Sequence, residues 1–195
     1  NPIAVSWFNR IKNNVATWIF AVNFGVVANG VTDNAGSLQR AINAAISTGR
    51  TLMLPAGEIL TSAQIKVTGV VGLQIIGQGR YNTYLKPHST FTGDSVLYYD
   101  SSTSTGRVDY TLLQGLTVDA TGFNTRAFDQ TFGGRKNVFR DVIFQGNRNS
   151  ASSSSVTRFK DQGANRYYDC EWWCDYASAW AVEFEDENLA SVISG

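Results

Sequence analysis

Acidic and aromatic residues are concentrated in the last part of the chain, where together they could bind and cleave a sugar polymer. Cleavage of a glycosidic bond generally needs two carboxyl groups, about 5 Å apart in retaining enzymes and about 6.5–9.5 Å apart in inverting ones. The acids of this segment, interleaved with three tryptophans, are Asp169, Glu171, Asp175, Glu183, Glu185 and Asp186. We expect Glu171, Asp175 and Glu183 to be the catalytic candidates and most of the remaining acids to be solvated surface charges.

A repeat in the sequence predicts where these residues lie. Three segments share the pattern apolar, any residue, Gly or Asp, apolar, any residue, apolar, and they are Leu113–Asp119, Phe139–Gln145 and Tyr167–Trp173. Their starts are 26 and 28 residues apart, which suits one coil of a solenoid with loops of variable length. Leu73–Gly77 resembles an earlier copy and Trp180–Phe184 a later strand. The alternative is chance similarity among the strands of an ordinary β-sandwich.

Side chains alternate in direction along a strand, so the repeat separates an inward set from an outward set. If Leu116 and Val118 face inward, Asp119 faces outward, and equivalent positions of stacked coils lie about 4.8 Å apart. Asp119, Gln145 and Trp173 are therefore predicted to form one exposed ladder that binds substrate. A pyranose ring could stack on the indole beside the carboxylate and the amide. The alternative is that Trp173 packs beneath a loop or against a neighbouring subunit.

The same alternation places Cys170 and Cys174 inward, as small buried hydrophobes with inert thiols. Four residues apart on one strand, they are too distant to form a disulfide. Two cysteines cannot complete a four-ligand zinc site, and no Asp/Asn cluster has the spacing of a calcium loop. The single His88, in a turn-like stretch, makes a Ser-His-Asp triad implausible. We predict neither a metal nor another cofactor.

The composition of the chain excludes further classes of function. The 195 residues include 16 basic and 16 acidic side chains, with no evident Lys/Arg cluster, so nucleic-acid binding is not expected. The apolar run Val15–Val27 is too short to span a bilayer and lacks the features of a signal peptide, so membrane insertion is not expected either. Because the sequence starts with Asn1, we interpret it as a fragment or a processed product.

A distinct motif precedes the repeat. Within Asn23–Asn34, Gly30 suits a tight turn, and the polar residues that follow it could cap a helix. The apolar face of that helix would consist of Leu38, Ile42, Ala45 and Ile46. Gly49 is placed to end the helix. Thr51–Gly57 then has the pattern of a buried strand closed by a Pro/Gly turn.

This order of features resembles the opening motif of the pectate lyase superfamily. There an Asp-aromatic-Gly-Ala start leads through Gly-Asp-Gly-Val-Thr-Asp-Asp into a helix and then a Leu-Pro-Ala-Gly turn. The resemblance covers residues 23–57, and Asn23 and Asn34 replace the first and last Asp of the pattern with another short polar side chain. It implies an all-β fold, a right-handed single-stranded parallel β-helix with a capping helix. It assigns no catalytic residue.

Three parts of the chain are therefore expected. Residues 1–22 would be an N-terminal helical neck or linker, residues 23–57 the opening and cap of the β-helix, and residues 58–195 its first, truncated rungs. The helical stripe would consist of Phe8, Ile11, Val15 and Trp18. It would pack either on the following domain or against the same stripe of other subunits. At roughly 25 residues per coil, about four or five rungs fit in the third part.

The helical stripe, the lack of a secretion signal and the lack of disulfides favour phage tailspikes among the proteins that share this resemblance. The resemblance to tailspikes then implies a homotrimer in the virion tail, outside the cell. It also implies that this trimer binds and depolymerises bacterial capsule or lipopolysaccharide and contacts other tail proteins. The alternatives are a non-catalytic glycan-binding or structural tail protein, and a secreted bacterial polysaccharide lyase or glycoside hydrolase. Substrate grooves in this superfamily usually need more coils, so an incomplete active site here is compatible with an enzymatic parent.

Overall fold

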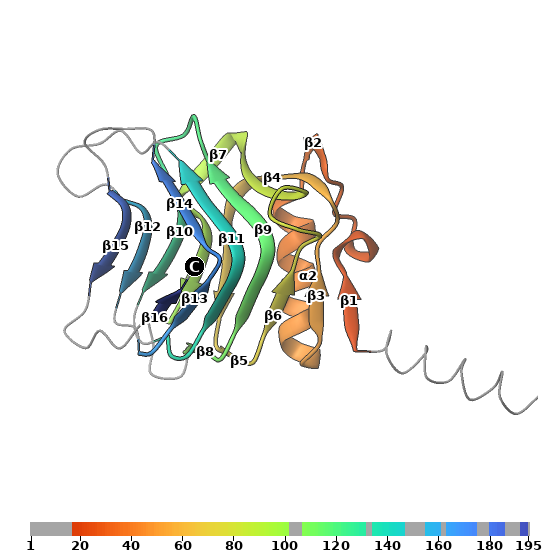
Figure 1. Ribbon diagram of the computed structural model, residues 1–195. Coiled ribbons are helices and arrows are strands. Elements are labelled where there is room, and N and C mark those ends of the chain that lie inside the picture. Colours follow the sequence, from red (N-terminus) through yellow and green to blue (C-terminus); the bar gives the residue numbers. More distant parts are fainter. Residues whose placement is uncertain are drawn as a thin grey trace, which may run out of the picture.

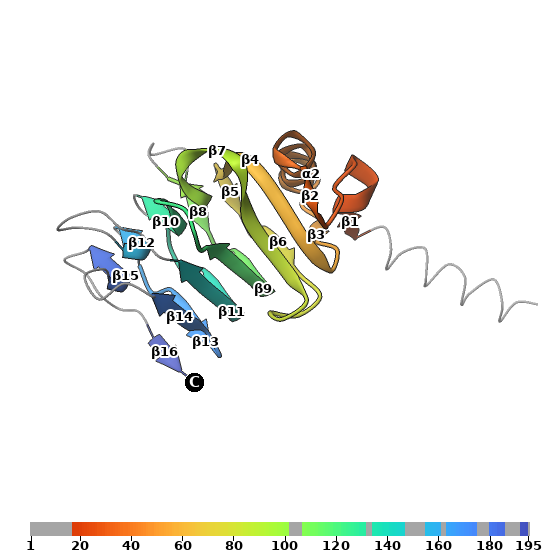
Figure 2. The same cartoon turned by 90° about the horizontal axis from the view of Figure 1, so that it is seen from above.

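The computed structural model describes residues 17–101, 107–131, 134–146, 155–160, 163–174, 180–185 and 192–194. They form a right-handed parallel β-helix of about five turns, with one α-helix at its N-terminal end (Figure 1). Seen from above, the coils follow one another from that helix towards the last strands (Figure 2). The predicted fold class is confirmed. Since the strands pair in parallel, the β-sandwich alternative is excluded.

The regular elements are short except for two long, bent strands. The helices are η1 (Ala21–Phe24) and α2 (Ala35–Thr48). The strands up to the middle of the chain are β1 (Trp18–Phe20), β2 (Asn29–Asp33), β3 (Thr51–Met53), β4 (Gly57–Thr68), β5 (Val70–Val71), β6 (Gln74–Ile76), β7 (Thr83–Asp100) and β8 (Val108–Asp109). The later strands are β9 (Leu112–Ala120), β10 (Arg126–Thr131), β11 (Val138–Gly146), β12 (Ser155–Lys160), β13 (Arg166–Tyr168), β14 (Glu171–Cys174), β15 (Trp180–Glu185) and β16 (Val192–Ser194).

The strands stack into three walls. The first wall contains β1, β3, β6, the first halves of β9 and β11, then β13 and β16. The second contains β2, the starts of β4 and β7, the second halves of β9 and β11, and β14. The third contains the ends of β4 and β7, then β10, β12 and β15. A residue in the middle of a wall therefore has neighbours from the coil before it and from the coil after it.

The interior is filled by apolar side chains that stack from coil to coil. Of the inward positions predicted from the repeat, Leu116, Val118, Val142 and Phe144 are completely buried, whereas the equivalent Cys170 and Trp172 are half-buried. Aromatic rings continue this core through the later coils. The rings of Phe139 and Tyr167 stack with centroids 5.2 Å apart and planes 11° apart. The rungs predicted at Leu73–Gly77 and Trp180–Phe184 are present as β6 and β15.

The two cysteines are free, and they are less buried than we expected. Cys170 and Cys174 are half-buried at the edge of the core. The reason is the position of β14, which pairs only with β11 among the described strands. Burial nevertheless raises the pKa of the Cys170 thiol to about 11. Because the thiolate is the reactive form, the prediction of an inert thiol agrees with this environment at Cys170.

The coils turn at residues with a left-handed backbone, which explains the Gly-or-Asp position of the repeat. One corner is formed by Gly115, Asp141 and Asp169, with φ values of 67°, 53° and 52°. Another is formed by Tyr110, Lys136 and Ala164, each with a φ of 55°. Gly adopts this conformation without strain, and Asp does so more readily than most residues. The Gly-or-Asp position of the repeat therefore marks a turn of the backbone, in addition to the apolar positions that mark the core.

Helix α2 covers the N-terminal end of the core. Leu38, Ile42 and Ala45 are buried, Ile46 packs against them, and Gly49 ends the helix with a φ of 64°. These predictions are confirmed. Asn34, however, does not cap the helix with its side chain as expected.

The buried amide of Asn34 instead connects the loop before α2 to the first coil. Its oxygen accepts a hydrogen bond from the Val27 N–H at 2.7 Å, and its Nδ2 contacts the carbonyls of Val27, Thr32 and Leu60. The Asp33 Oδ1 accepts a hydrogen bond from the Ala35 N–H at 3.0 Å in the first turn of α2. Asp33, rather than Asn34, therefore caps this helix.

The predicted helical neck lies mostly outside the described residues, since residues 1–16 are not among them. Trp18, which we assigned to the helical stripe, lies in β1 and pairs with Thr51 of β3. That assignment was wrong. Ile19 points into the core while Trp18 is exposed, so the segment follows the two-residue period of a strand.

Candidate functional site

The second wall carries the ladder predicted from the repeat. Asp119 of β9 pairs with Gln145 of β11, and Gln145 pairs with Trp173 of β14. The predicted register is therefore correct, and Trp173 is 51% exposed. Asp119 departs from the expectation because only 4% of its surface is accessible. One of its carboxylate oxygens lies 3.4 Å from Lys86 Nζ and the other accepts a hydrogen bond from the Thr121 N–H, so both oxygens have partners.

The indole of Trp173 is held in place by a chain of polar contacts. Its Nε1 donates a hydrogen bond to Glu171 Oε2 at 2.9 Å. The other oxygen of Glu171 lies 2.9 Å from Arg80 Nη1, and Arg80 Nε lies 3.2 Å from Asp141 Oδ1. Both oxygens of the Glu171 carboxylate are thus occupied. The arrangement fixes an exposed aromatic ring beside the Gln145 amide, which is suited to stacking against the C–H face of a sugar.

The three residues that we expected to be catalytic are not found together. Glu171 lies on β14 of the second wall, whereas Glu183 lies on β15 of the third. Asp175 lies outside the described residues. Twelve positions separate Glu171 from Glu183 in the sequence. They lie on different walls because β14 pairs with β11 and β15 pairs with β12.

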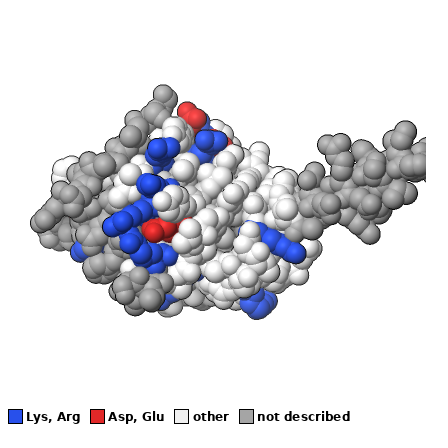
Figure 3. Space-filling model, turned by 90° about the horizontal axis from the view of Figure 1, so that it is seen from below, with Lys and Arg blue, Asp and Glu red and all other residues white. Residues whose placement is uncertain are grey.

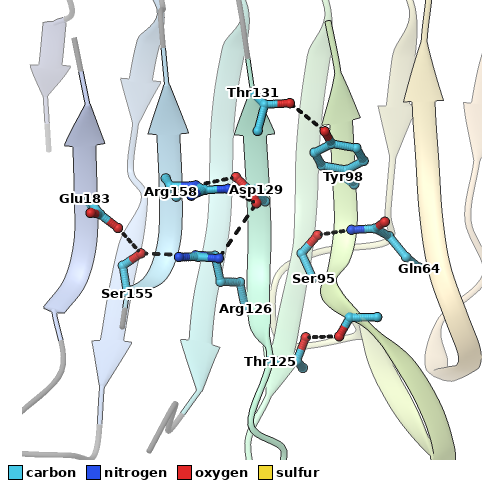
Figure 4. A network of polar contacts seen from close by, with 11 residues as sticks. Gln64, Ser95, Tyr98, Thr125, Arg126, Asp129, Thr131, Ser155, Arg158 and Glu183 are labelled. Carbon is cyan, nitrogen blue, oxygen red and sulfur yellow. Dashed lines mark hydrogen bonds and ion pairs between the residues drawn. The ribbon is translucent and has the colours of Figure 1, made fainter. Parts of the chain in front are cut away.

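The third wall carries a second polar network, which contains Glu183 (Figure 4). Arg158 donates two hydrogen bonds to the two oxygens of Asp129, at 2.9 and 2.7 Å. Glu183 Oε2 accepts a hydrogen bond from the Ser155 hydroxyl at 2.7 Å, and Ser155 Oγ accepts one from Arg126 Nε at 3.3 Å. Arg126 Nη1 lies 3.9 Å from Asp129 Oδ2 and links the two halves of the network.

The register explains why these side chains meet. Asp129, Arg158 and Glu183 occupy equivalent positions on β10, β12 and β15. Asp129 and Glu183 are thus two strands apart, which corresponds to about 9–10 Å between their backbones. This spacing lies near the range of about 6.5–9.5 Å that separates the two carboxyl groups of inverting glycosidases. Asp129 itself is 3% exposed and firmly paired, whereas Glu183 is half-buried.

The network extends to earlier coils of the third wall. Tyr98 pairs with Asp129 in the register and shares a 2.6 Å hydrogen bond with the hydroxyl of Thr131. Burial raises the pKa of the Tyr98 hydroxyl, although the hydrogen bond with Thr131 acts in the opposite direction. Gln64 donates a hydrogen bond to Ser95 at 2.6 Å. Tyr98 is consequently a neutral hydrogen-bonding group near neutral pH.

Comparison with known proteins places the chain in a family. A model of the pectate lyase-like family described as rhamnogalacturonase A/epimerase matches residues 18–174. The chain belongs to this pectate lyase-like family. None of the curated proteins compared matches the sequence.

Two solved structures show the same fold as this pectate lyase-like chain at low sequence identity. ORF18 of Geobacillus virus E2 is 15% identical, with a TM-score of 0.71 over 94% of this chain and 38% of the phage chain. This chain therefore spans well under half of that phage protein. A putative glycosyl hydrolase from Parabacteroides merdae is 14% identical, with a TM-score of 0.58 over 91% of this chain and 98% of the other.

Sequence reasoning missed Arg126, Asp129 and Arg158 on the third wall of this pectate lyase-like chain. The sequence contains a 29-residue spacing that could have revealed them, because it separates Arg126 from Ser155 and Asp129 from Arg158. The repeat recognised in the sequence contains only strands of the first and second walls, and the 29-residue spacing belongs to the third. The described residues contain no group of three or more His, Cys, Asp or Glu that could hold a metal ion. Among these residues, no helix is long and apolar enough to cross a membrane.

Proposed function

We propose that this pectate lyase-like chain is the glycan-binding part of a phage tailspike-like protein that binds and depolymerises bacterial capsule or lipopolysaccharide. The observation that carries the proposal is the exposed Trp173 ring, fixed by Glu171 at one end of the Asp119–Gln145–Trp173 ladder. The phage origin of a similarly folded protein supports a place in a virion tail, outside the cell.

The ladder would bind sugar through two kinds of contact. The indole face would stack against a pyranose ring, and the Gln145 amide would hydrogen-bond to hydroxyl groups on a neighbouring sugar. Asp119 would act indirectly, since its buried carboxylate faces Lys86 and orients that ammonium group. Glu171 would be a positioning residue, because its oxygens already bind Trp173 and Arg80.

Binding can be tested by substituting the exposed tryptophans one at a time. We expect Trp173→Ala to weaken binding of the host polysaccharide by about tenfold or more, since one stacked ring contributes about 1–3 kcal/mol in comparable stacking sites. The measurement is affinity electrophoresis against capsular polysaccharides and lipopolysaccharides. Trp18→Ala is the matched control because Trp18 is 46% exposed on β1 of the first wall, away from the ladder and from the third wall. Equal losses in both variants would contradict a specific Trp173 site.

Depolymerisation is proposed to use the third wall. Glu183 is the stronger of the two described catalytic candidates, because one of its carboxylate oxygens accepts a hydrogen bond from Ser155 and the side chain lies two strands from Asp129. Asp175, which follows β14 in the sequence, stays a candidate for the second carboxyl group.

Catalysis can be tested in the intact parent protein. We expect Glu183→Gln to lower the rate of polysaccharide cleavage by roughly 10²-fold or more, because a carboxyl group that transfers a proton typically contributes 10²–10⁴-fold. Reducing ends report hydrolysis and absorbance of unsaturated uronates reports elimination. Asp94→Asn, at an exposed carboxylate away from the ladder and from Glu183, serves as the control. Glu171→Gln should raise KM more than it lowers kcat; the reverse result would make Glu171 the catalyst.

Two other functions remain as outcomes of these tests. If polysaccharide is bound and never cleaved, the chain is a non-catalytic glycan-binding or structural tail component. Similarity to the putative glycosyl hydrolase, which this chain covers almost completely, favours a secreted bacterial glycoside hydrolase or polysaccharide lyase as the second candidate.

We propose that the intact protein is a homotrimer that contacts other tail proteins. A monomer in sedimentation of the intact parent would count against the tailspike assignment.

A further inference from the structure

A groove lies on the outer side of the first wall, away from the Trp173 ladder. It has a volume of about 330 Å³ and is lined by Tyr110, Lys136, Val138 and Arg166. Val138 of β11 pairs with Leu112 of β9 on one side and with Arg166 of β13 on the other. The lining residues thus come from three successive coils. The groove therefore crosses the coils, and an extended ligand along the helix axis could occupy it.

Positive charge gathers around this groove. Lys136 and Arg166 are exposed, as are Arg135 and Arg140 on the middle coil. Viewed from below, Lys and Arg cluster over the later coils around an acidic group (Figure 3). Arg107 lies on the preceding coil, 3.5 Å from the carboxylate of Asp109. Since the whole chain has a net charge of zero, the excess of positive charge is local to this surface.

The basic side chains at the groove are held by aromatic rings. Lys136 Nζ lies 5.4 Å from the centroid of the Tyr110 ring, and Arg140 Cζ lies 5.4 Å from that of Tyr168. Within the described part of the chain, neither cation forms an ion pair with a carboxylate, and neither does Arg166. Cation–π contact orients a side chain without neutralising its charge. These cations are therefore positioned to pair with an anionic ligand.

We propose that this groove binds a stretch of polysaccharide that carries carboxylate groups. Arg166 binds a carboxylate through its planar guanidinium, Lys136 pairs with a second, and the exposed Tyr110 ring contacts a sugar on the side of Lys136 away from Arg166. Because successive coils lie about 4.8 Å apart, the three groups follow one another along the helix axis and can contact an extended chain. The inference rests on the function proposed above and names the charge class of its glycan.

A nucleic acid is the less favoured occupant. It carries a negative charge at every phosphate, and the carboxylate of Asp109, which accepts a hydrogen bond from the Arg135 N–H, lies among the basic residues. A glycan with carboxylates on only some of its sugars avoids this repulsion. The two occupants are compared directly in the experiment.

The test uses the 195-residue chain with polygalacturonate as the carboxylated probe and dextran as the neutral one. We expect polygalacturonate to bind more tightly than dextran in calorimetric titrations. The double variant Lys136→Gln/Arg166→Gln should weaken polygalacturonate binding by roughly tenfold or more, since two charge-assisted contacts are lost. The control Arg50→Gln/Lys66→Gln removes the same charge from exposed residues elsewhere and should change affinity by less than about twofold.

Three results would overturn the proposal: equal weakening in both double variants, tighter binding of dextran, or tighter binding of single-stranded DNA that Lys136→Gln/Arg166→Gln weakens. The Trp173→Ala variant separates this proposal from the preceding one. If Trp173→Ala abolishes binding of host polysaccharide while the groove variant leaves polygalacturonate binding intact, the groove proposal fails and the proposed function stands. If only the groove variant has an effect, the groove proposal stands and the Trp173 site fails.

Discussion

At Gly57 the chain leaves the Leu-Pro-Ala-Gly turn and enters β4 with a φ of 111°. A Cβ atom at this position would collide with the carbonyl oxygen of Ala28. The glycine of the opening motif is therefore required twice, by the backbone conformation and by the close approach of the loop before β2. The sequence motif indicates a turn here, and the structure adds the second reason.

We accordingly expect Gly57→Ala to lower the free energy of unfolding by about 3 kcal/mol, through backbone strain and steric conflict together. Gly49→Ala is the matched control because Gly49 has a φ of 64° and no neighbouring atom within 4 Å of an added Cβ. It should lose only about 1 kcal/mol, the cost of a left-handed residue. Urea unfolding followed by circular dichroism measures both losses, and equal losses would refute the steric argument.

At the scale of elements, the cap shows how one polar side chain joins a helix to the first coil. The amide of Asn34 is buried and surrounded by three backbone carbonyls, to which only an N–H donor is suited. The superfamily pattern has Asp at this position, and we expected either residue to serve as a helix cap. The contacts show that in this chain the amide nitrogen is the essential part of the side chain.

Asn34→Asp should therefore destabilise the protein by about 3 kcal/mol at pH 7, because a buried carboxylate would face three carbonyl oxygens. That environment raises the pKa of the new carboxyl group in the folded state above its unfolded value. Stability is then retained below the unfolded pKa and lost as the pH rises through the folded pKa. Part of the loss should be recovered near pH 4. Asn43→Asp, on the exposed side of α2, should be nearly neutral in the same unfolding measurements.

At the scale of the whole molecule, the later coils are held together by a continuous aromatic core. The Phe139 ring lies within 6.3 Å of five other rings, those of Tyr99, Phe128, Phe144, Phe159 and Tyr167. The half-buried Phe184 ring contacts Phe159 and Tyr167, at 5.4 and 6.0 Å. In a solenoid each coil is stabilised by its neighbours, so a central ring supports more of the structure than a ring near the last strands.

We expect Phe139→Ala to cost about 3–5 kcal/mol and Phe184→Ala clearly less, because the second site is half-buried. Hydrogen exchange should show loss of protection in β9, β11 and β13 for Phe139→Ala, whereas the change for Phe184→Ala should stay near β12 and β15. Comparable losses of stability and protection in the two variants would argue against a core that is built coil by coil.

The sequence by itself determined the fold, the register of the second wall and the helical cap. These follow from local rules: side chains alternate along strands, apolar residues recur at helical spacing, and Gly or Asp marks the left-handed corners. The same rules placed Asp119, Gln145 and Trp173 on one ladder.

Only the tertiary structure decided which outward side chains are accessible and which distant residues meet. It buried Asp119 beside Lys86, brought Arg80 into contact with Glu171, and placed Glu183 on the third wall. It also gathered basic residues into one cluster that no run of the sequence displays. The physical reason is that coil length and corner positions set these neighbours. Residues about 26–29 positions apart become adjacent, whereas close neighbours in sequence can be turned onto different walls.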